Sequence, residues 1–156
     1  MNCLRAKNLL EDIENTIEDI KKFDYASDLE KSYLAKFLVV FISGMYEEII
    51  ETIISEKVEQ LRSPQVSSFI NKYLEDYFRN PKFEKILDLL KKFDENWAEE
   101  LNKTEKILKI ALDNIVINKN AIAHGNLCEI TLPRVNEDYK NSKKVIEKID
   151  QIILST

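Results

Sequence analysis

One short segment of this chain, from Ile115 to Asn126, concentrates the side chains that could do proton-transfer chemistry. It contains His124, the only histidine in the sequence, and Gly125, one of only two glycines. An imidazole has an unperturbed pKa near about 6.5, so it can both accept and donate a proton at neutral pH. We therefore expect any proton-transfer chemistry of this chain to use His124.

The spacing of apolar residues predicts that this segment is a helix ending beside His124. Leu108, Ile115 and Ile122 recur at seven-residue intervals, which is the periodicity of one helix face. Gly125 follows at a position where a left-handed C-terminal cap is expected. The last carbonyl groups of such a helix would favour the imidazolium form of His124.

Two polar residues precede His124 in the same predicted helix. Asn120 lies four residues earlier and shares a helix face with His124, so its amide could orient the ring. Lys119 lies five residues earlier, which is about 140° away around the helix axis. A site that needs both Lys119 and His124 is therefore completed more easily across a dimer than within one chain.

The segment that ends at Gly125 resembles the signature of HEPN domains (higher eukaryotes and prokaryotes nucleotide-binding). That signature is an arginine, a polar residue, three further residues and a histidine, and it often ends in Ala-His-Gly. Other segments also resemble stand-alone prokaryotic HEPN domains of the RiboL-PSP type, so the resemblance spans most of the chain. These segments are Gly44-Met45-Tyr46-Glu47, Ser63-Pro64, Lys92-Phe93-Asp94-x-x-Trp97 and Ile130-Thr131-Leu132.

The resemblance implies a metal-independent endoribonuclease with its active site in the cleft of a homodimer. By this resemblance, His124 moves the proton when a ribose 2′-hydroxyl attacks the adjacent phosphate. Lys119 would stabilise the charged phosphorane, and Asn120 would orient the groups. Glu47, with Tyr46 beside it, is expected to support the site near His124. For Glu47 an exposed or ion-paired carboxylate is the alternative.

RNA is the partner that this resemblance implies, together with a second copy of the chain. Such domains often belong to toxin–antitoxin or phage-defence systems of prokaryotes, so an antitoxin or another protein is a further expected partner. One position departs from the family pattern, because Lys119 stands where the family has arginine. Lysine supplies a point charge without arginine's planar, two-point contact to phosphate.

This departure keeps two other hypotheses open. The second hypothesis is a catalytically inactive HEPN dimer that binds RNA, a nucleotide or a protein partner. Lys119 favours it, and the retained His124 opposes it. The third is an antitoxin-like or purely structural helical protein, which predicts no cleft at His124.

The composition predicts one all-α domain over residues 1–156. Hydrophobic residues make up 44% of the chain and charged residues 33%, with only two glycines and three prolines, which is typical of a soluble, helix-rich protein. With the resemblance, we expect an up-and-down HEPN-like bundle of five to six helices that forms a two-fold dimer.

The net charge restricts where RNA could bind. A formal charge of −5 opposes indiscriminate nucleic-acid binding, because that binding depends on basic groups that neutralise phosphates. RNA would therefore need a local basic patch. Basic residues late in the chain could form this patch or simply a solvated helix face: Lys119, Arg134, Lys140, Lys143, Lys144 and Lys148.

The sequence gives no reason to expect a metal, a cofactor or a membrane. Cys3 and Cys128 lack metal-ligand spacing, and one histidine cannot complete a zinc set. We expect free thiols in a reducing cytoplasm and, without a basic and then apolar N-terminus, no signal peptide. The most apolar run, Phe37 to Ile42, is far shorter than the roughly 20 residues of a membrane-spanning helix.

Capping and proline signals mark the expected helix starts. Ser27 and Glu30 form a capping-box pattern, and a good N-cap followed by proline occurs at Ser63-Pro64 and Asn80-Pro81. The first helix should end near Phe23, and the second should run to about Leu61. The motif helix should begin near Thr104, and the last helix near Leu132.

The expected helices contain one glycine, Gly44, and two aromatic stripes. Gly44 lacks a side chain and interrupts the second helix, so another helix could approach closely there. The two helices after Ser63 and Asn80 carry aromatic stripes that include Phe69 and Tyr77 in one and Phe83 and Trp97 in the other. We assign both stripes to the core in preference to surfaces for nucleobases.

Overall fold

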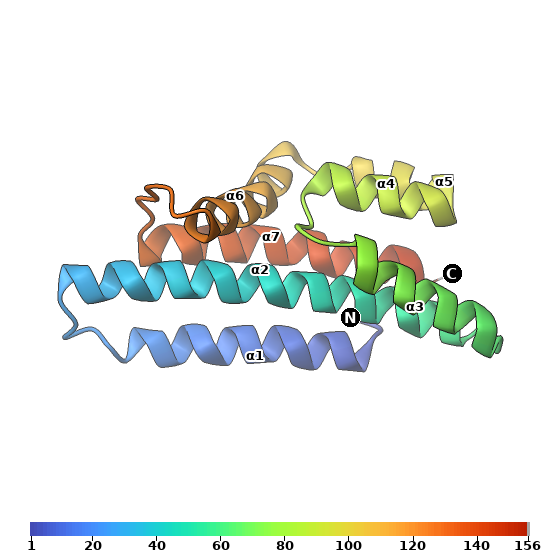
Figure 1. Ribbon diagram of the computed structural model, residues 1–156, viewed down its shortest axis with the longest axis horizontal. Coiled ribbons are helices and arrows are strands. Elements are labelled where there is room, and N and C mark those ends of the chain that lie inside the picture. Colours follow the sequence, from blue (N-terminus) through green and yellow to red (C-terminus); the bar gives the residue numbers. More distant parts are fainter. Residues whose placement is uncertain (156) are drawn as a thin grey trace.

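The computed structural model describes residues 1–155, and the regular elements of these residues are all helices (Figure 1). Thr156, the last residue of the expected domain, lies outside them. The all-α prediction is confirmed. No helix of the described residues is both long and apolar enough to cross a membrane. The helices are α1 (Leu4–Lys21), α2 (Asp28–Glu59), α3 (Pro64–Tyr77), α4 (Phe83–Phe93), α5 (Glu95–Asn102), α6 (Lys106–Ala123) and α7 (Leu132–Leu154).

Helix α2 is the centre of the bundle and packs against α1, α7, α6 and α3. Helices α1, α2 and α7 run along the long axis, whereas α3, α4 and α5 lie toward one end (Figure 1). The predicted capping box starts α2, because the Ser27 hydroxyl accepts from the Glu30 N–H and the Glu30 carboxylate accepts from the Ser27 N–H. Apolar residues then line the face of α2 that enters the core, among them Ile42, Ile49 and Ile53.

The opposite face of α2 changes character halfway along the helix. Its first half is apolar and uncovered, with exposed side chains at Leu29, Tyr33, Phe37 and Val40. A Cβ atom at Gly44 would meet nothing within 4 Å, so the close helix approach that we expected there does not occur within this chain. In the second half this face carries polar groups that contact other segments: Glu47, Glu51 and Ser55.

The start of α4 differs from its prediction. Asn80 has a φ of 56° and does not cap a helix, and α4 begins only at Phe83. The physical reason is that the Asn80 side chain accepts a hydrogen bond from Lys119 of α6 instead of from the next turn of its own chain. A local capping pattern has therefore been replaced by a tertiary contact.

The helix expected to include both Phe83 and Trp97 is divided in two. Asp94 has an extended backbone, with φ −159° and ψ 123°, and ends α4. Its carboxylate accepts from the Asn96 N–H at 2.8 Å and caps α5. The described residues consequently form seven helices instead of five to six.

The aromatic stripe of α3 is exposed, in contrast to that of α4. Phe69 and Tyr77 are 70% and 66% exposed, whereas Leu74 is buried against the bundle. The core assignment is therefore wrong for Phe69 and Tyr77, because α3 packs on α2 along one narrow face. In α4 the assignment is confirmed for Phe83, which is buried.

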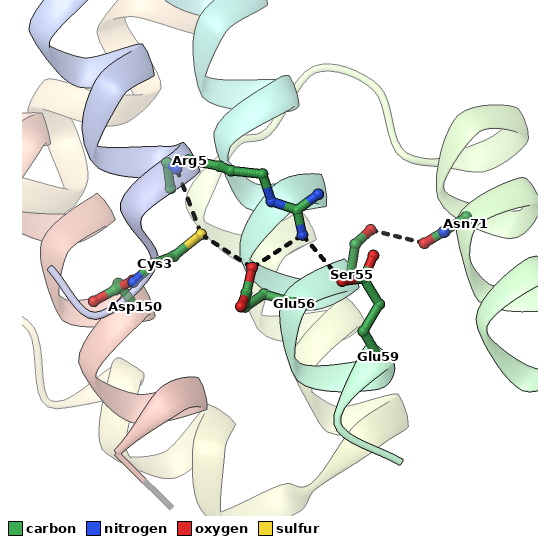
Figure 2. Close-up of polar contacts among 8 residues, drawn as sticks. Cys3, Arg5, Ser55, Glu56, Glu59, Asn71 and Asp150 are labelled. Atoms are coloured by element: carbon green, nitrogen blue, oxygen red, sulfur yellow. Dashed lines mark hydrogen bonds and ion pairs between the residues drawn. The ribbon is translucent and has the colours of Figure 1, made fainter. Parts of the chain in front are cut away.

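The start of α1 is tied to the ends of α2 and α7 (Figure 2). The buried Asp150 carboxylate of α7 accepts from the backbone N–H of Asn2 and from that of Cys3, the latter at 2.9 Å. The Arg5 guanidinium lies 2.9 Å from Glu56 and 3.2 Å from Glu59. These contacts fix the three long helices relative to one another at this end of the bundle.

Candidate functional site

Lys119 points from α6 into a polar junction with α2 and the loop that joins α3 to α4. Its Nζ donates to Asn80 Oδ1 at 2.8 Å and lies 4.0 Å from Glu47 Oε1. Glu47 Oε1 also accepts from the backbone N–H of Asn80 at 2.8 Å. The side chains of Lys119 and Glu47 are only 24% and 15% exposed. We name Glu47, Asn80 and Lys119 the junction residues.

Asn80 is the junction residue that sequence reasoning missed as a site residue. Its φ of 56° lies in the left-handed region, which asparagine tolerates better than most residues with a side chain. This conformation lets its backbone N–H face Glu47 while its side-chain oxygen faces Lys119. The Asn80-Pro81 pair was a signal for a special backbone, but it gave no information about the partners.

Lys119 keeps bonding capacity in spite of these contacts. An ammonium has three N–H donors, and Asn80 Oδ1 occupies one of them. Glu47 Oε1, at 4.0 Å from Nζ, is beyond hydrogen-bond distance and acts through charge alone. Lys119 can therefore still donate to an anionic oxygen that reaches the junction.

A second ion pair lies one turn further along α2. Arg79 Nη1 is 3.2 Å from Glu51 Oε1 and donates to the Phe78 carbonyl at 3.0 Å. Lys85 Nζ donates to the Arg79 carbonyl. Burial raises the pKa of Glu51 most, the positive charge of Arg79 works in the opposite direction, and the nearby Glu47 raises it again. Positively and negatively charged side chains thus alternate where α2 meets the loop between α3 and α4.

His124 stands at the C-terminal end of α6, as its sequence position predicts. It is the C-cap residue, and its backbone N–H donates to the Asn120 carbonyl at 3.0 Å. Gly125 has a φ of 70°, and the Asn126 N–H donates to the Ala121 carbonyl at 2.9 Å. The predicted left-handed glycine cap is confirmed.

The His124 ring is exposed and has no hydrogen-bond partner within residues 1–155. In particular, the contact between Asn120 and His124 joins their backbones and leaves the Asn120 amide apart from the ring. A role of Asn120 in orienting the ring is thus absent from this arrangement. Any such role would require a bound substrate or a second copy of the chain.

Tyr46 lies in the core instead of beside His124. It is fully buried, and its hydroxyl is 2.7 Å from the Ser142 Oγ of α7. Burial raises the pKa of Tyr46 far above its usual range. Successive helix residues point about 100° apart, so Glu47 faces the junction while Tyr46 faces α7. Tyr46 therefore faces away from the junction residues, and its supporting role stays a prediction.

His124 ends an exposed stripe on α6, whereas Lys119 faces the other way. Ile110 and Ile117 are 45% and 49% exposed and recur with His124 at seven-residue intervals, on one helix face. Lys119 points instead toward Asn80. The divergence that the five-residue spacing predicts is present in the structure, so one chain does not bring the two side chains together.

Two of the late basic residues that could have formed an RNA patch lie on α7 and are ion-paired there. Arg134 Nη2 lies 3.2 Å from Asp138 Oδ1, and Lys143 Nζ lies 2.6 Å from Glu14 and 3.6 Å from Glu147. These contacts favour the alternative of a solvated helix face for α7. No group of three or more histidine, cysteine, aspartate and glutamate side chains in the described residues could hold a metal ion.

Comparison with known proteins identifies the family. The family model described as RiboL-PSP-HEPN matches residues 2–155, which include the junction residues and the whole of α6. No curated protein and no solved structure gave a significant match. The matched region covers almost the entire sequence, so the chain belongs to the RiboL-PSP-HEPN family.

Proposed function

We propose that this protein is a metal-independent endoribonuclease that acts as a homodimer, with its active site in the cleft between two copies of α6. The observation that carries the proposal is the position of His124 at the end of the exposed Ile110 and Ile117 stripe. These two half-exposed isoleucines offer a second copy an apolar surface on which to pack. A second copy packed on them would place His124 beside a two-fold interface.

The reaction needs one proton carrier and one cation. His124 takes the proton of a ribose 2′-hydroxyl while that oxygen forms a bond to the adjacent phosphorus. The bond from phosphorus to the 5′-oxygen breaks, and this oxygen receives the proton that His124 took, which returns the imidazole to its neutral form. The products are a 2′,3′-cyclic phosphate and a 5′-hydroxyl end. Lys119 stabilises the negative charge of the phosphorane, and Asn120 orients the groups.

The junction residues support this role for Lys119. Asn80 and Glu47 hold its ammonium at a fixed place on α2 and α6, and a preorganised cation stabilises a transition state better than a mobile one. Within one chain Lys119 and His124 lie on different faces of α6, so a site that uses both side chains would take them from two copies. Family membership supports chemistry on RNA or a nucleotide.

A catalytically inactive HEPN dimer that binds RNA, a nucleotide or a protein partner is the second candidate. The close contact of Lys119 with Asn80, together with the charge of Glu47, favours it, because a cation that is already compensated attracts phosphate less strongly. For both candidates we propose a cytoplasmic role in a toxin–antitoxin or phage-defence system. An antitoxin or another protein would then be a partner.

Incubation of the purified protein with total RNA tests the first candidate. Cleavage that persists in EDTA and disappears in His124→Ala would support it, because the mechanism uses no metal. Cleavage that requires a divalent ion, or that His124→Ala retains in full, would contradict it. RNA binding without cleavage by a folded dimer would favour the second candidate.

A further inference from the structure

Helix α3 presents an aromatic row that the core does not use. Phe69, Tyr73 and Tyr77 follow one another at four-residue intervals, and the outer two are largely exposed. The rings of Tyr73 and Tyr77 are 5.1 Å apart between centroids. A groove of about 650 Å³ runs along these rings, and Gln65, Ser68 and Lys72 also line it.

Lysines from α3 and α4 flank the aromatic row. Lys92 Nζ donates to the Tyr73 hydroxyl at 2.6 Å and lies 5.2 Å from the ring centroid. Lys72 lines the groove, and Lys85 lines a smaller hollow on the other side of Tyr73 and Tyr77. The carboxylates that line these two hollows are Asp76 and Asp88, fewer than the lysines. With three lysines and two aspartates, the lining of the two hollows has a small positive charge on a chain of net charge −5.

The aromatic row leads to the candidate site along the chain. Tyr77 ends α3, and the half-exposed Arg79 follows two residues later. Asn80, the next residue, contacts Lys119. In Figure 1 the C-terminal end of α3 continues into the loop that reaches the middle of the bundle. Only Phe78 and Arg79 separate Tyr77 from Asn80, so a short loop joins the groove to the junction residues.

We propose that this face of α3 binds single-stranded RNA and guides it to Lys119. Unpaired bases stack on the exposed rings of Phe69 and Tyr77, while phosphates contact Lys72, Lys92 and Arg79. Stacking suits any base because every base has a flat π-face, and lysines beside the rings follow the phosphate backbone. The inference rests on the proposed function in one respect, namely that the ligand is RNA.

The composition of the face favours RNA over a protein partner. The rings share the groove with the polar side chains of Gln65, Ser68, Lys72 and Asp76, whereas the core of a protein interface is depleted of charged residues. Alternation of aromatic and basic groups is instead typical of proteins that bind single strands. Protein docking is one outcome that the experiment below separates.

Binding of a labelled oligouridine to the full-length His124→Ala protein tests the proposal without cleavage. Phe69→Ala and Tyr77→Ala should each weaken binding at least about fivefold, as expected for the loss of one stacked base. Phe69→Trp should retain binding, and Phe69→Leu should lose it, because leucine keeps apolar surface without a flat ring. Tyr25→Ala is the matched control, since Tyr25 is highly exposed and lies before α2.

The proposal also predicts an NMR signal of base stacking, in addition to these affinities. The ring-proton resonances of Tyr77 should move upfield when oligouridine is added, because a stacked base shields them. Full binding by Phe69→Leu would show that the flat face is unused, as expected for protein docking, and would overturn the proposal. Unchanged binding by Phe69→Ala and Tyr77→Ala, or no binding of oligouridine at physiological salt, would overturn it as well.

The results also separate this proposal from the ribonuclease proposal. A protein with an intact His124 that shows the binding pattern above but cleaves no RNA would contradict the ribonuclease and leave the α3 surface supported. A protein that cleaves total RNA, and whose Phe69→Ala and Tyr77→Ala variants bind oligouridine normally, would contradict the α3 surface alone.

Discussion

The Lys119 ammonium donates a hydrogen bond to the side-chain oxygen of Asn80 at 2.8 Å, across 39 residues of sequence. This contact fixes the only cation of the family motif to a loop residue in the left-handed conformation. Glu47 completes the arrangement by accepting from the backbone N–H of the same asparagine. The position of the motif lysine thus depends on α2 and on the α3–α4 loop as much as on α6.

The first prediction concerns the motif itself. Lys119→Ala and His124→Ala should abolish cleavage of RNA, and Lys119→Arg should keep or raise it, because arginine adds two-point contact to phosphate. Lys119→Ala should also lower the free energy of unfolding by about 1 kcal/mol, since Asn80 loses its donor. Cleavage assays and chemical denaturation measure the two effects. Full activity in Lys119→Ala would show that this lysine does not replace the family arginine.

The second prediction separates the two functions of Asn80. Asn80→Gly keeps the left-handed backbone and removes the acceptor for Lys119, so it should lower kcat and cost about 1 kcal/mol of unfolding free energy, because the same hydrogen bond is lost as in Lys119→Ala. Asn80→Ala should lower kcat equally and cost about 1 kcal/mol more in unfolding free energy, because alanine is strained at this φ. Asn80→Asp restores an acceptor and should recover part of kcat. Equal kcat in Asn80→Gly and the parent would refute the positioning role.

The third prediction addresses the dimer. Ile117→Glu places a charge on the exposed stripe of α6 and should convert a dimer into a folded monomer that no longer cleaves RNA. Light scattering gives the mass, and circular dichroism reports the fold. Leu4→Glu is the control, because Leu4 is also an exposed aliphatic residue, at 69% against 49% for Ile117, but lies at the start of α1. A dimer that survives Ile117→Glu would place the interface elsewhere.

The fourth prediction follows from the raised pKa of Glu51. Burial is its main cause, so the folded state holds the proton more tightly than the unfolded state. The contribution of this group to stability is complete below the unfolded pKa and is lost as the pH rises through the folded pKa. Glu51→Gln cannot ionise and should therefore melt above the parent at pH 7, with a smaller difference below about pH 4. The exposed Glu48 supplies the control, Glu48→Gln.

Thermal unfolding at pH 7 and below about pH 4 shows whether Glu51→Gln is more or less stable than the parent at each pH. A parent protein that is more stable than Glu51→Gln at pH 7 would mean that the Arg79 ion pair outweighs the cost of burial. A difference that does not depend on pH would mean that ionisation of Glu51 is not its cause.

The fifth prediction contrasts the two glycines. Gly44 lies in the middle of α2, and an added Cβ would meet nothing within 4 Å, so Gly44→Ala should raise the unfolding free energy by about 1 kcal/mol. Gly125 has a φ of 70°, so Gly125→Ala should lower it by about 1 kcal/mol. Chemical denaturation measures both changes. Loss of stability in Gly44→Ala would indicate that a second copy packs closely against α2.

The sequence by itself determined the features that depend on neighbouring residues. The capping box of Ser27 and Glu30, the glycine cap at Gly125 and the start of α3 at Pro64 all follow from hydrogen bonds or backbone angles within a few residues. The divergence of Lys119 and His124 also follows from helix geometry alone. Family membership was also predictable, because the family's motifs are short segments of neighbouring residues, such as the one from Lys119 to Gly125.

Only the tertiary structure decided which polar groups meet and which apolar groups are buried. Asn80 has the sequence pattern of a helix cap, but Lys119 and Glu47 from two distant helices bind it instead. Phe69 and Phe83 both lie in apolar stripes, yet only Phe83 is buried. The physical reason is that burial and long-range pairing depend on how the helices pack, and a single helix stripe does not specify its partner.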